Sequence, residues 1–282
     1  MAEPPAAVVG RLRAARGFVF DMDGTLVLGD RHNHRFVPLA GALELTGLLR
    51  RRGVPFAVLT NGTTRTPEEY AAALRALGFE LEATRVLTPA VSALDVLTRR
   101  GQTRAMVLGT EGLTAPLEAA GIEVVSPRGR PRVDAVLAGW YRQFTMDALE
   151  AACHAVWGGA AFYSCSQSRF FATAEGRAMA TSRAMSAMVR SMTGCRVEVV
   201  GKPSLHALRS AARRLGRRVA DLAVVGDDPE LEVPMAHRGG ALAVAVATGL
   251  GSAAAFDRLP ERRRPHLTLA GVDALLALYR SG

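Results

Sequence analysis

The sequence predicts an α/β protein in which helices flank a parallel β-sheet and a second α/β unit is inserted into the first. Short apolar runs bounded by turn residues alternate with longer amphipathic stretches along the chain, a pattern typical of βαβ units. Polar residues follow several of these runs directly. The stretch 88–195, which separates two groups of such residues, is too long for a connecting loop and indicates a separate unit.

The apolar runs predict strands, because each is short, hydrophobic and closed by residues that favour turns. The first run, FVF, leads directly into Asp21 and Asp23. In chain order the expected strands are 17–20, 55–60, 104–109, 122–125, 134–139, 160–165, 197–200, 222–226 and 241–246.

The amphipathic stretches between these runs predict helices, and two of them have clear start signals. Thr66-Pro67-Glu68-Glu69 combines an N-cap, a proline in the first turn and two acids that face the helix dipole. Thr88-Pro89 repeats the cap and the proline. The expected helices are 39–51, 67–77, 89–99, 111–120, 146–156, 180–192, 204–215 and 271–280.

The composition limits the classes of partner. The formal net charge is +9, but the basic residues form short scattered clusters, so we expect no nucleic-acid partner and only a modest attraction for anionic small substrates. The cysteines lack CxxC spacing, which indicates neither a disulfide framework nor a zinc site. The most apolar segment, 241–256, is too short for a membrane span and is interrupted by glycines. Since the N-terminus has no apolar stretch typical of a signal peptide, we expect a cytoplasmic protein with no membrane partner.

Residues that can do chemistry follow four of the expected strands. Ligands in open α/β sheets bind beyond the carboxyl ends of the strands, so we expect these residues to surround one site. They stand in the segments Asp21-Met22-Asp23-Gly24-Thr25, Thr60-Asn61-Gly62, Gly201-Lys202-Pro203 and Gly226-Asp227-Asp228.

These residue types suit phosphoryl transfer. Clustered carboxylates hold Mg²⁺, which prefers oxygen ligands, while a lysine and short hydroxyl or amide groups bind phosphoryl oxygens. One carboxylate can attack phosphorus while its neighbour moves protons. Each segment alone can also be explained as a turn or a helix cap without any catalytic role, because aspartates and Thr-Asn-Gly are common there. Their order and their shared position after strands favour the catalytic interpretation.

Four motifs resemble those of the haloacid dehalogenase (HAD) superfamily: DMDGTLVLGD, LTNGTTRTPEEY, GKPS and VVGDDPELE. Their order and spacing resemble the NagD-like, p-nitrophenyl-phosphatase-like branch, which has a large α/β cap (class IIA). The resemblance implies a Rossmann-like parallel-sheet HAD core over 1–87 and 196–282 and an inserted α/β cap over 88–195. It also implies dimerisation through the cap.

The activity implied by this resemblance is Mg²⁺-dependent hydrolysis of a small phosphomonoester through an aspartyl-phosphate. The substrate would be a sugar phosphate, glycerol phosphate, phosphoglycolate or a similar metabolite. Asp21 would be the nucleophile, Asp23 the general acid/base, and Lys202 would neutralise Asp21 and the phosphate. The residues that bind the phosphoryl group would be Thr60, Asn61, Lys202 and Gly24, with Thr25 in the same turn.

By the same resemblance, Mg²⁺ would be held by Asp21, the backbone carbonyl of Asp23, and Asp227. The family usually has a second acid, commonly aspartate, five residues after the first acid of its last motif, and here that residue is glutamate. The second motif also departs from the frequent Thr-Asn-Asn by reading Thr-Asn-Gly. The choice of the acid that supports the metal stays open among Asp228, Glu230 and Glu232.

The segment 163–176 resembles the cap region in which relatives place residues that face the substrate. Arg169 and Glu175 are therefore candidates for leaving-group contacts, with a plain surface position as the alternative. Trp140 and Trp157 are expected in the cap core rather than around a ligand. The alternative function is a catalytically idle protein that senses a phosphorylated metabolite on the same fold.

Overall fold

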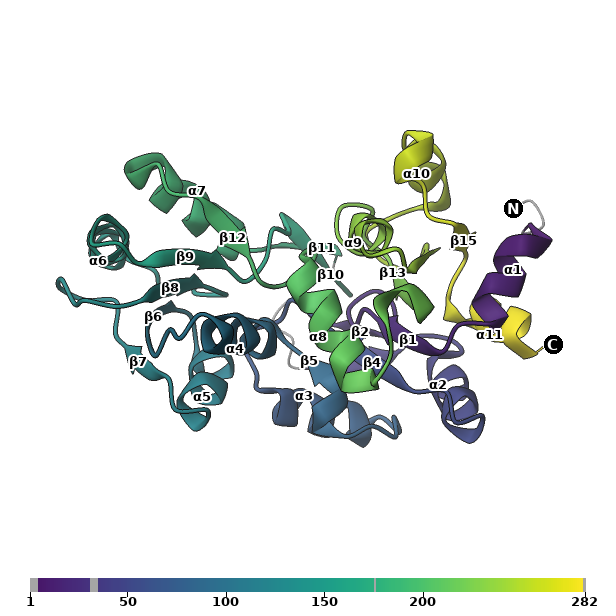
Figure 1. Ribbon diagram of the computed structural model, residues 1–282. Coiled ribbons are helices and arrows are strands. Elements are labelled where there is room, and N and C mark those ends of the chain that lie inside the picture. Colours follow the sequence, from purple (N-terminus) through teal and green to yellow (C-terminus); the bar gives the residue numbers. More distant parts are fainter. Residues whose placement is uncertain (1–4, 31–34, 175, 281–282) are drawn as a thin grey trace.

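The computed structural model describes residues 5–30, 35–174 and 176–280. Two sheet-containing halves lie side by side, and both chain ends lie at the far end of the half that contains β1 (Figure 1). The described residues include no helix with both the length and the apolar composition needed to cross a membrane.

The first sheet is entirely parallel and has the order β15-β14-β13-β1-β4-β5. β1 is central, so Phe20 pairs with Val225 on one side and Val58 on the other. The residues after β1 therefore leave the middle of the sheet edge. The strands are β1 (Gly17–Phe20), β4 (Phe56–Leu59), β5 (Val86–Leu87), β13 (Leu222–Gly226), β14 (Leu242–Val246) and β15 (Leu267–Leu269).

Helices cover both faces of this sheet because successive β1 side chains point to opposite faces. Phe18 and Phe20 pack in the apolar cluster that includes residues of α2, α3 and α11. Val19 packs in the opposite cluster, with residues of α8 and α9. The helices are α1 (Ala6–Arg13), α2 (Ala42–Arg51), α3 (Pro67–Ala76), α8 (Leu205–Leu215), α9 (Glu232–Gly239), α10 (Ala253–Asp257) and α11 (Val272–Arg280), with short 3₁₀ turns at Ala83–Arg85, Val219–Asp221 and Glu261–Arg263.

The second sheet is also parallel, with the order β12-β9-β8-β6-β7. One apolar cluster joins it to α4 and α5, and another joins it to α6 and α7. Its elements are α4 (Pro89–Arg99), β6 (Arg104–Leu108), α5 (Glu111–Ala119), β7 (Glu123–Val125), β8 (Ala135–Ala138), α6 (Met146–Trp157), β9 (Ala161–Ser164), α7 (Ser182–Thr193) and β12 (Val197–Val199).

Two antiparallel hairpins meet between the halves. β2 (Val27–Gly29) pairs with β3 (Phe36–Pro38), and β10 (Phe170–Thr173) pairs with β11 (Gly176–Met179). The backbone N–H of Ala174 donates to the carbonyl of Gly29 at 2.8 Å. A segment of the inserted part therefore lies against β2, within the first motif.

The predicted α/β fold with parallel sheets is confirmed, and every predicted strand and helix has a counterpart close to its expected position. The elements absent from the expected ranges are short: β2, β3, β5, β10, β11, β15, α1, α9 and α10. Segments of two to eight residues carry too little periodicity to predict and depend on their neighbours for stability.

The strand at Val197–Val199 pairs with β9 of the second sheet, whereas the expected core began at residue 196. Its apolar character predicts a strand but does not specify which sheet it joins. Residues 88–199 are called the cap below, and the remaining residues the core. In the cap, Trp157 is 56% exposed, so its expected place in the cap core is wrong.

Candidate active site

Asp21 and Asp23 stand in the turn that follows β1. The N–H of Asp21 donates to the carbonyl of Val225 at 2.8 Å, which extends the sheet by one residue. Gly24 then turns the chain with a φ of +83°, a conformation that glycine adopts without steric cost. A Cβ on Gly24 would lie 2.6 Å from Oδ2 of Asp227. The Asp-Gly-Thr sequence therefore lets two acid-bearing turns approach each other closely.

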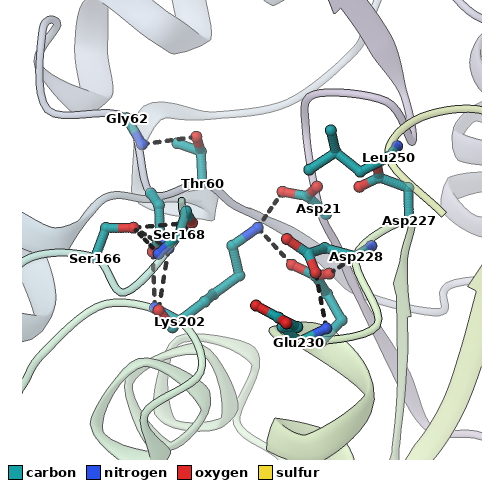
Figure 2. A network of polar contacts seen from close by, with 12 residues as sticks. Asp21, Thr60, Gly62, Ser166, Ser168, Lys202, Asp227, Asp228, Glu230 and Leu250 are labelled. Carbon is teal, nitrogen blue, oxygen red and sulfur yellow. Dashed lines mark hydrogen bonds and ion pairs between the residues drawn. The ribbon is translucent and has the colours of Figure 1, made fainter. Parts of the chain in front are cut away.

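Lys202 is the buried cation of the site, with 2% of its surface exposed. Its Nζ contacts Oδ1 of Asp21 and lies 2.7 Å from Oε1 of Glu232 (Figure 2). Burial alone would lower the lysine pKa, but these two carboxylates raise it above its ordinary value. The lysine therefore remains charged, which is the condition for neutralising a carboxylate and a phosphate.

Asp23 has a raised pKa. Burial, reinforced by the negative charge of Asp21 and opposed by Lys202, raises the pKa of Asp23 to about 7. Its buried Oδ1 has no hydrogen-bond partner among the described residues. A carboxyl with this pKa can both donate and accept a proton near neutral pH.

A group of buried carboxylates lies beside the lysine. Oxygens of Asp21, Asp227 and Glu232 all lie within 4.8 Å of one another. Burial, followed by the charges of Asp21 and Glu232, raises the pKa of Asp227, while burial is the largest cause that raises the pKa of Glu232 to about 8. Crowded carboxylates of this kind fit a hard divalent cation such as Mg²⁺, which would relieve their repulsion.

The three acids left open by the sequence occupy different positions. Glu232 lies in the carboxylate group and pairs with Lys202. Asp228 lines the cavity, and its Oδ1 accepts the N–H of Glu230 at 2.7 Å. Glu230 pairs with Arg169 at 2.5 Å. Of these three, Glu232 is the acid whose carboxylate stands among the candidate metal ligands.

Asn61 holds the Lys202 segment in place. Its Oδ1 accepts the backbone N–H of Lys202 at 2.7 Å, and its Nδ2 donates to the Lys202 carbonyl at 3.1 Å. The same Nδ2 reaches Oγ of Ser166 at 3.0 Å, so one amide ties the second motif to the third and to the cap. Thr60 is 2% exposed and lines the cavity, and its Oγ1 accepts the N–H of Gly62 at 3.0 Å.

Steric crowding explains why glycine stands at position 62 in Thr-Asn-Gly. A Cβ on Gly62 would lie 2.1 Å from the hydroxyl oxygen of Tyr70. Tyr70 is fully buried, and its hydroxyl lies 3.3 Å from Oγ1 of Thr64. An asparagine at position 62 therefore requires the tyrosine to move.

A cavity of about 320 Å³ joins this chemistry to the cap. Trp140 lines it, and the backbone N–H of Trp140 donates to Oγ1 of Thr63 at 2.8 Å. Trp140 therefore lies at the cavity and in neither apolar cluster of the cap, where it was expected. Sequence reasoning also missed other lining residues. Arg65 stands inside the second motif, and Ser168, Phe170 and Phe171 stand inside the segment 163–176 that resembles the substrate-facing region of relatives, so their positions were flagged although the residues were not named. Nothing in the sequence singles out Arg142 and Thr181.

Of the two predicted leaving-group residues, the structure describes Arg169 alone. Arg169 is about half exposed, pairs with Glu230, and is not among the described residues that line the cavity. The guanidinium of Arg169 therefore connects the cap to the loop after β13. Glu175 lies outside the described residues.

Known proteins resemble both parts of the chain. Residues 18–123 match the haloacid dehalogenase-like hydrolase family, and residues 199–275 match a second, HAD-hydrolase-like family. Mouse chronophin is 32% identical over 256 residues, covering 88% of this chain and 86% of its own. The solved 4-nitrophenylphosphatase of Thermotoga maritima superposes with a TM-score of 0.84 at 23% identity, covering 95% of this chain and 99% of its own. A Mycobacterium tuberculosis glycerol phosphate phosphatase, solved with calcium, superposes with a TM-score of 0.81 at 28% identity, covering 94% of this chain and 76% of its own.

Proposed function

This chain belongs to the haloacid dehalogenase-like hydrolases and is a phosphatase of that family, and we propose that it is a Mg²⁺-dependent phosphomonoesterase acting through an aspartyl-phosphate. The names of its relatives support a small phosphorylated metabolite as substrate, since they include a glycerol phosphate phosphatase and an acid sugar phosphatase. Sugar phosphates, glycerol phosphate and phosphoglycolate are the classes to test.

The observation that carries this proposal is the pairing of two unlike aspartates at one cavity. Asp21 contacts the buried ammonium of Lys202, while Asp23 has a pKa raised to about 7. Two neighbouring carboxylates in different environments can divide the work of nucleophile and acid/base between them.

The first half-reaction transfers the phosphoryl group to the enzyme. A carboxylate oxygen of Asp21 forms a bond to phosphorus as the ester bond to the leaving group breaks. Protonated Asp23 gives its proton to the departing oxygen, which leaves as an alcohol. Lys202 stabilises the negative charge on the phosphoryl oxygens, with the hydroxyl of Thr60 as a second contact.

The second half-reaction restores the enzyme. Asp23, now a carboxylate, accepts a proton from water while the water oxygen bonds to phosphorus. The bond between phosphorus and the Asp21 oxygen breaks, which releases inorganic phosphate and returns Asp21 to its starting state. Asn61 keeps Lys202 in position during both steps through its two hydrogen bonds to the lysine backbone.

Asp21, Asp227 and the backbone carbonyl of Asp23 would hold Mg²⁺, with Glu232 beside them. When bound, the ion would neutralise charge on the carboxylates and on the phosphoryl oxygens. A protein that only senses a metabolite has no use for a second aspartate kept partly protonated, so the idle-sensor alternative is not proposed.

The test is phosphate release from sugar phosphates, glycerol 3-phosphate, phosphoglycolate and p-nitrophenyl phosphate. Wild type should turn over with Mg²⁺ and stop with EDTA, and Asp21→Asn should lose at least about 10⁴-fold in kcat because the nucleophile is gone. Glu230→Gln, which changes an acid outside the carboxylate group, is the matched control. Turnover that survives in Asp21→Asn would contradict the aspartyl-phosphate route.

A further inference from the structure

The cavity lining includes a second group of residues, called the cap end below, whose chemistry the proposed reaction does not use. This group consists of aromatic side chains and two arginines, in contrast to the carboxylates around Lys202. The residues are Arg65 from the core and Trp140, Arg142, Phe170 and Phe171 from the cap.

Neither arginine pairs with a carboxylate among the residues that the structure describes, whereas Arg169 pairs with Glu230. Each guanidinium group lies near an aromatic ring. The guanidinium carbon of Arg65 is 5.3 Å from the ring centre of Phe36, and that of Arg142 is 6.0 Å from the ring centre of Trp140. Arg65 is also partly buried. Unpaired cations at a ligand cavity attract anionic groups.

Two of these aromatic residues, Trp140 and Phe171, are in contact and form the aromatic wall of the cavity. The Trp140 and Phe171 ring centres are 5.4 Å apart at an interplanar angle of 75°, an edge-to-face arrangement that fixes the orientation of both rings. The backbone N–H of Trp140 donates to Oγ1 of Thr63 in the second motif. This anchor sets the wall relative to the loop that carries Thr60 and Asn61. A flat ligand ring can stack on such a surface.

We propose that Trp140, Phe171, Arg65 and Arg142 form the leaving-group subsite, and that the preferred substrates are phosphomonoesters of a flat ring bearing an anionic substituent. The aromatic wall contacts the ring and the arginines contact the anion. This inference rests on the proposed phosphatase function and specifies its substrate class.

Four esters separate the two features of the leaving group. 4-Carboxyphenyl phosphate is flat and anionic, phenyl phosphate is flat only, phosphoglycolate is anionic only, and glycerol 3-phosphate is neither. Wild type should give its highest kcat/KM with 4-carboxyphenyl phosphate. A higher kcat/KM for either of the two non-aromatic esters would overturn the proposal.

Single substitutions then test which residue recognises the anionic group and which recognises the ring. Arg65→Gln and Arg142→Gln should each reduce the ratio of kcat/KM for 4-carboxyphenyl phosphate over phenyl phosphate by about fivefold, the effect of one partly exposed charge contact. Trp140→Leu should reduce the ratio for phenyl phosphate over glycerol 3-phosphate. Arg169→Gln, the matched arginine outside the cavity, should change neither ratio. Unchanged ratios in both cavity arginine variants would overturn the assignment.

The two proposals fail differently. If wild type hydrolyses the esters with equal preference, the phosphatase proposal stands and the subsite is wrong. If folded wild type releases no phosphate from any ester, the proposed reaction is wrong, and calorimetric dissociation constants for 4-carboxyphenyl and phenyl phosphate test the subsite. In that case, the subsite is supported if 4-carboxyphenyl phosphate binds more tightly than phenyl phosphate and if Arg142→Gln removes this difference. Equal dissociation constants for the two esters in wild type reject it.

Discussion

The cations in the two groups of cavity residues differ in burial and in their partners. Lys202 is almost completely buried and has carboxylate partners on two sides, whereas Arg142 is exposed at the cavity with an aromatic ring as its neighbour. The charges needed for phosphoryl transfer are thus fixed before a substrate binds, which is the arrangement that makes electrostatic catalysis effective. The charges at the cap end remain available to the ligand. We therefore attribute the reaction to the residues around Lys202 and the choice of substrate to the residues of the cap end.

The largest effect is expected from removing the buried cation. Lys202→Met should lower kcat/KM by about 10²–10³-fold, because the nucleophile and the phosphoryl oxygens lose their counter-charge. It should also lower the free energy of unfolding by about 3 kcal/mol at neutral pH, since Asp21 and Glu232 are left buried without a partner.

Steady-state kinetics and urea unfolding measure these two effects. Arg142→Met is the matched control, because it removes a cation from the other end of the cavity and should leave stability nearly unchanged. Equal losses of stability in the two variants would contradict the contrast between a paired and an unpaired end.

An intermediate effect is expected on the pH dependence of stability. The folded-state pKa of Asp23 is about 7, above the ordinary value of 3.8, so folding favours the protonated form. The stability that this group contributes is complete below pH 4 and is lost as pH rises toward 7 and beyond. In EDTA, Asp23→Asn should therefore raise the free energy of unfolding at pH 8 by about 1–3 kcal/mol and have little effect at pH 4.

Urea unfolding at both pH values provides the measurement, with the exposed Asp147→Asn as control. A variant that is less stable than wild type at pH 8 would show that the charged form of Asp23 is not strained in the folded protein. Such a result would contradict the raised pKa of Asp23 on which its proposed acid/base role depends.

The smallest effect is expected from the ion pair outside the cavity. Arg169 and Glu230 have side chains that are 57% and 48% exposed, and exposed pairs contribute little because water screens them. Arg169→Gln should change the free energy of unfolding by less than about 1 kcal/mol and leave kcat/KM within about twofold for all four esters. A tenfold loss restricted to anionic leaving groups would instead place Arg169 in the subsite, as the sequence suggested.

The residues at the catalytic end could be predicted because the chain itself fixes their positions. Asp21 directly follows the central strand β1, and Asp227 directly follows its neighbour β13. Parallel pairing of these strands brings the two aspartates together without help from any loop. The strand signals and the motif positions were therefore sufficient for this part of the site.

The cap end could not be predicted because its members meet only after two sheets have packed. Trp140 follows β8 while Phe171 belongs to a short hairpin, and their rings meet across the cavity wall. Arg169 is adjacent in sequence to that hairpin, yet its guanidinium pairs with Glu230. Chain position places a residue near the right loop, but the direction of its side chain depends on contacts with distant segments.

The pairing of β12 with β9 has a consequence for engineering chimeric enzymes. The chain passes from Val199, in the edge strand of the cap sheet, almost directly to Lys202, whose backbone is also clasped by Asn61 of the core. An exchange of caps joined at residue 196 would transplant the donor sheet without its own edge strand. A junction after β12 keeps that sheet whole but places donor residues directly before the Lys202 segment, so a graft made to alter substrate choice also replaces the strand that leads into the catalytic lysine.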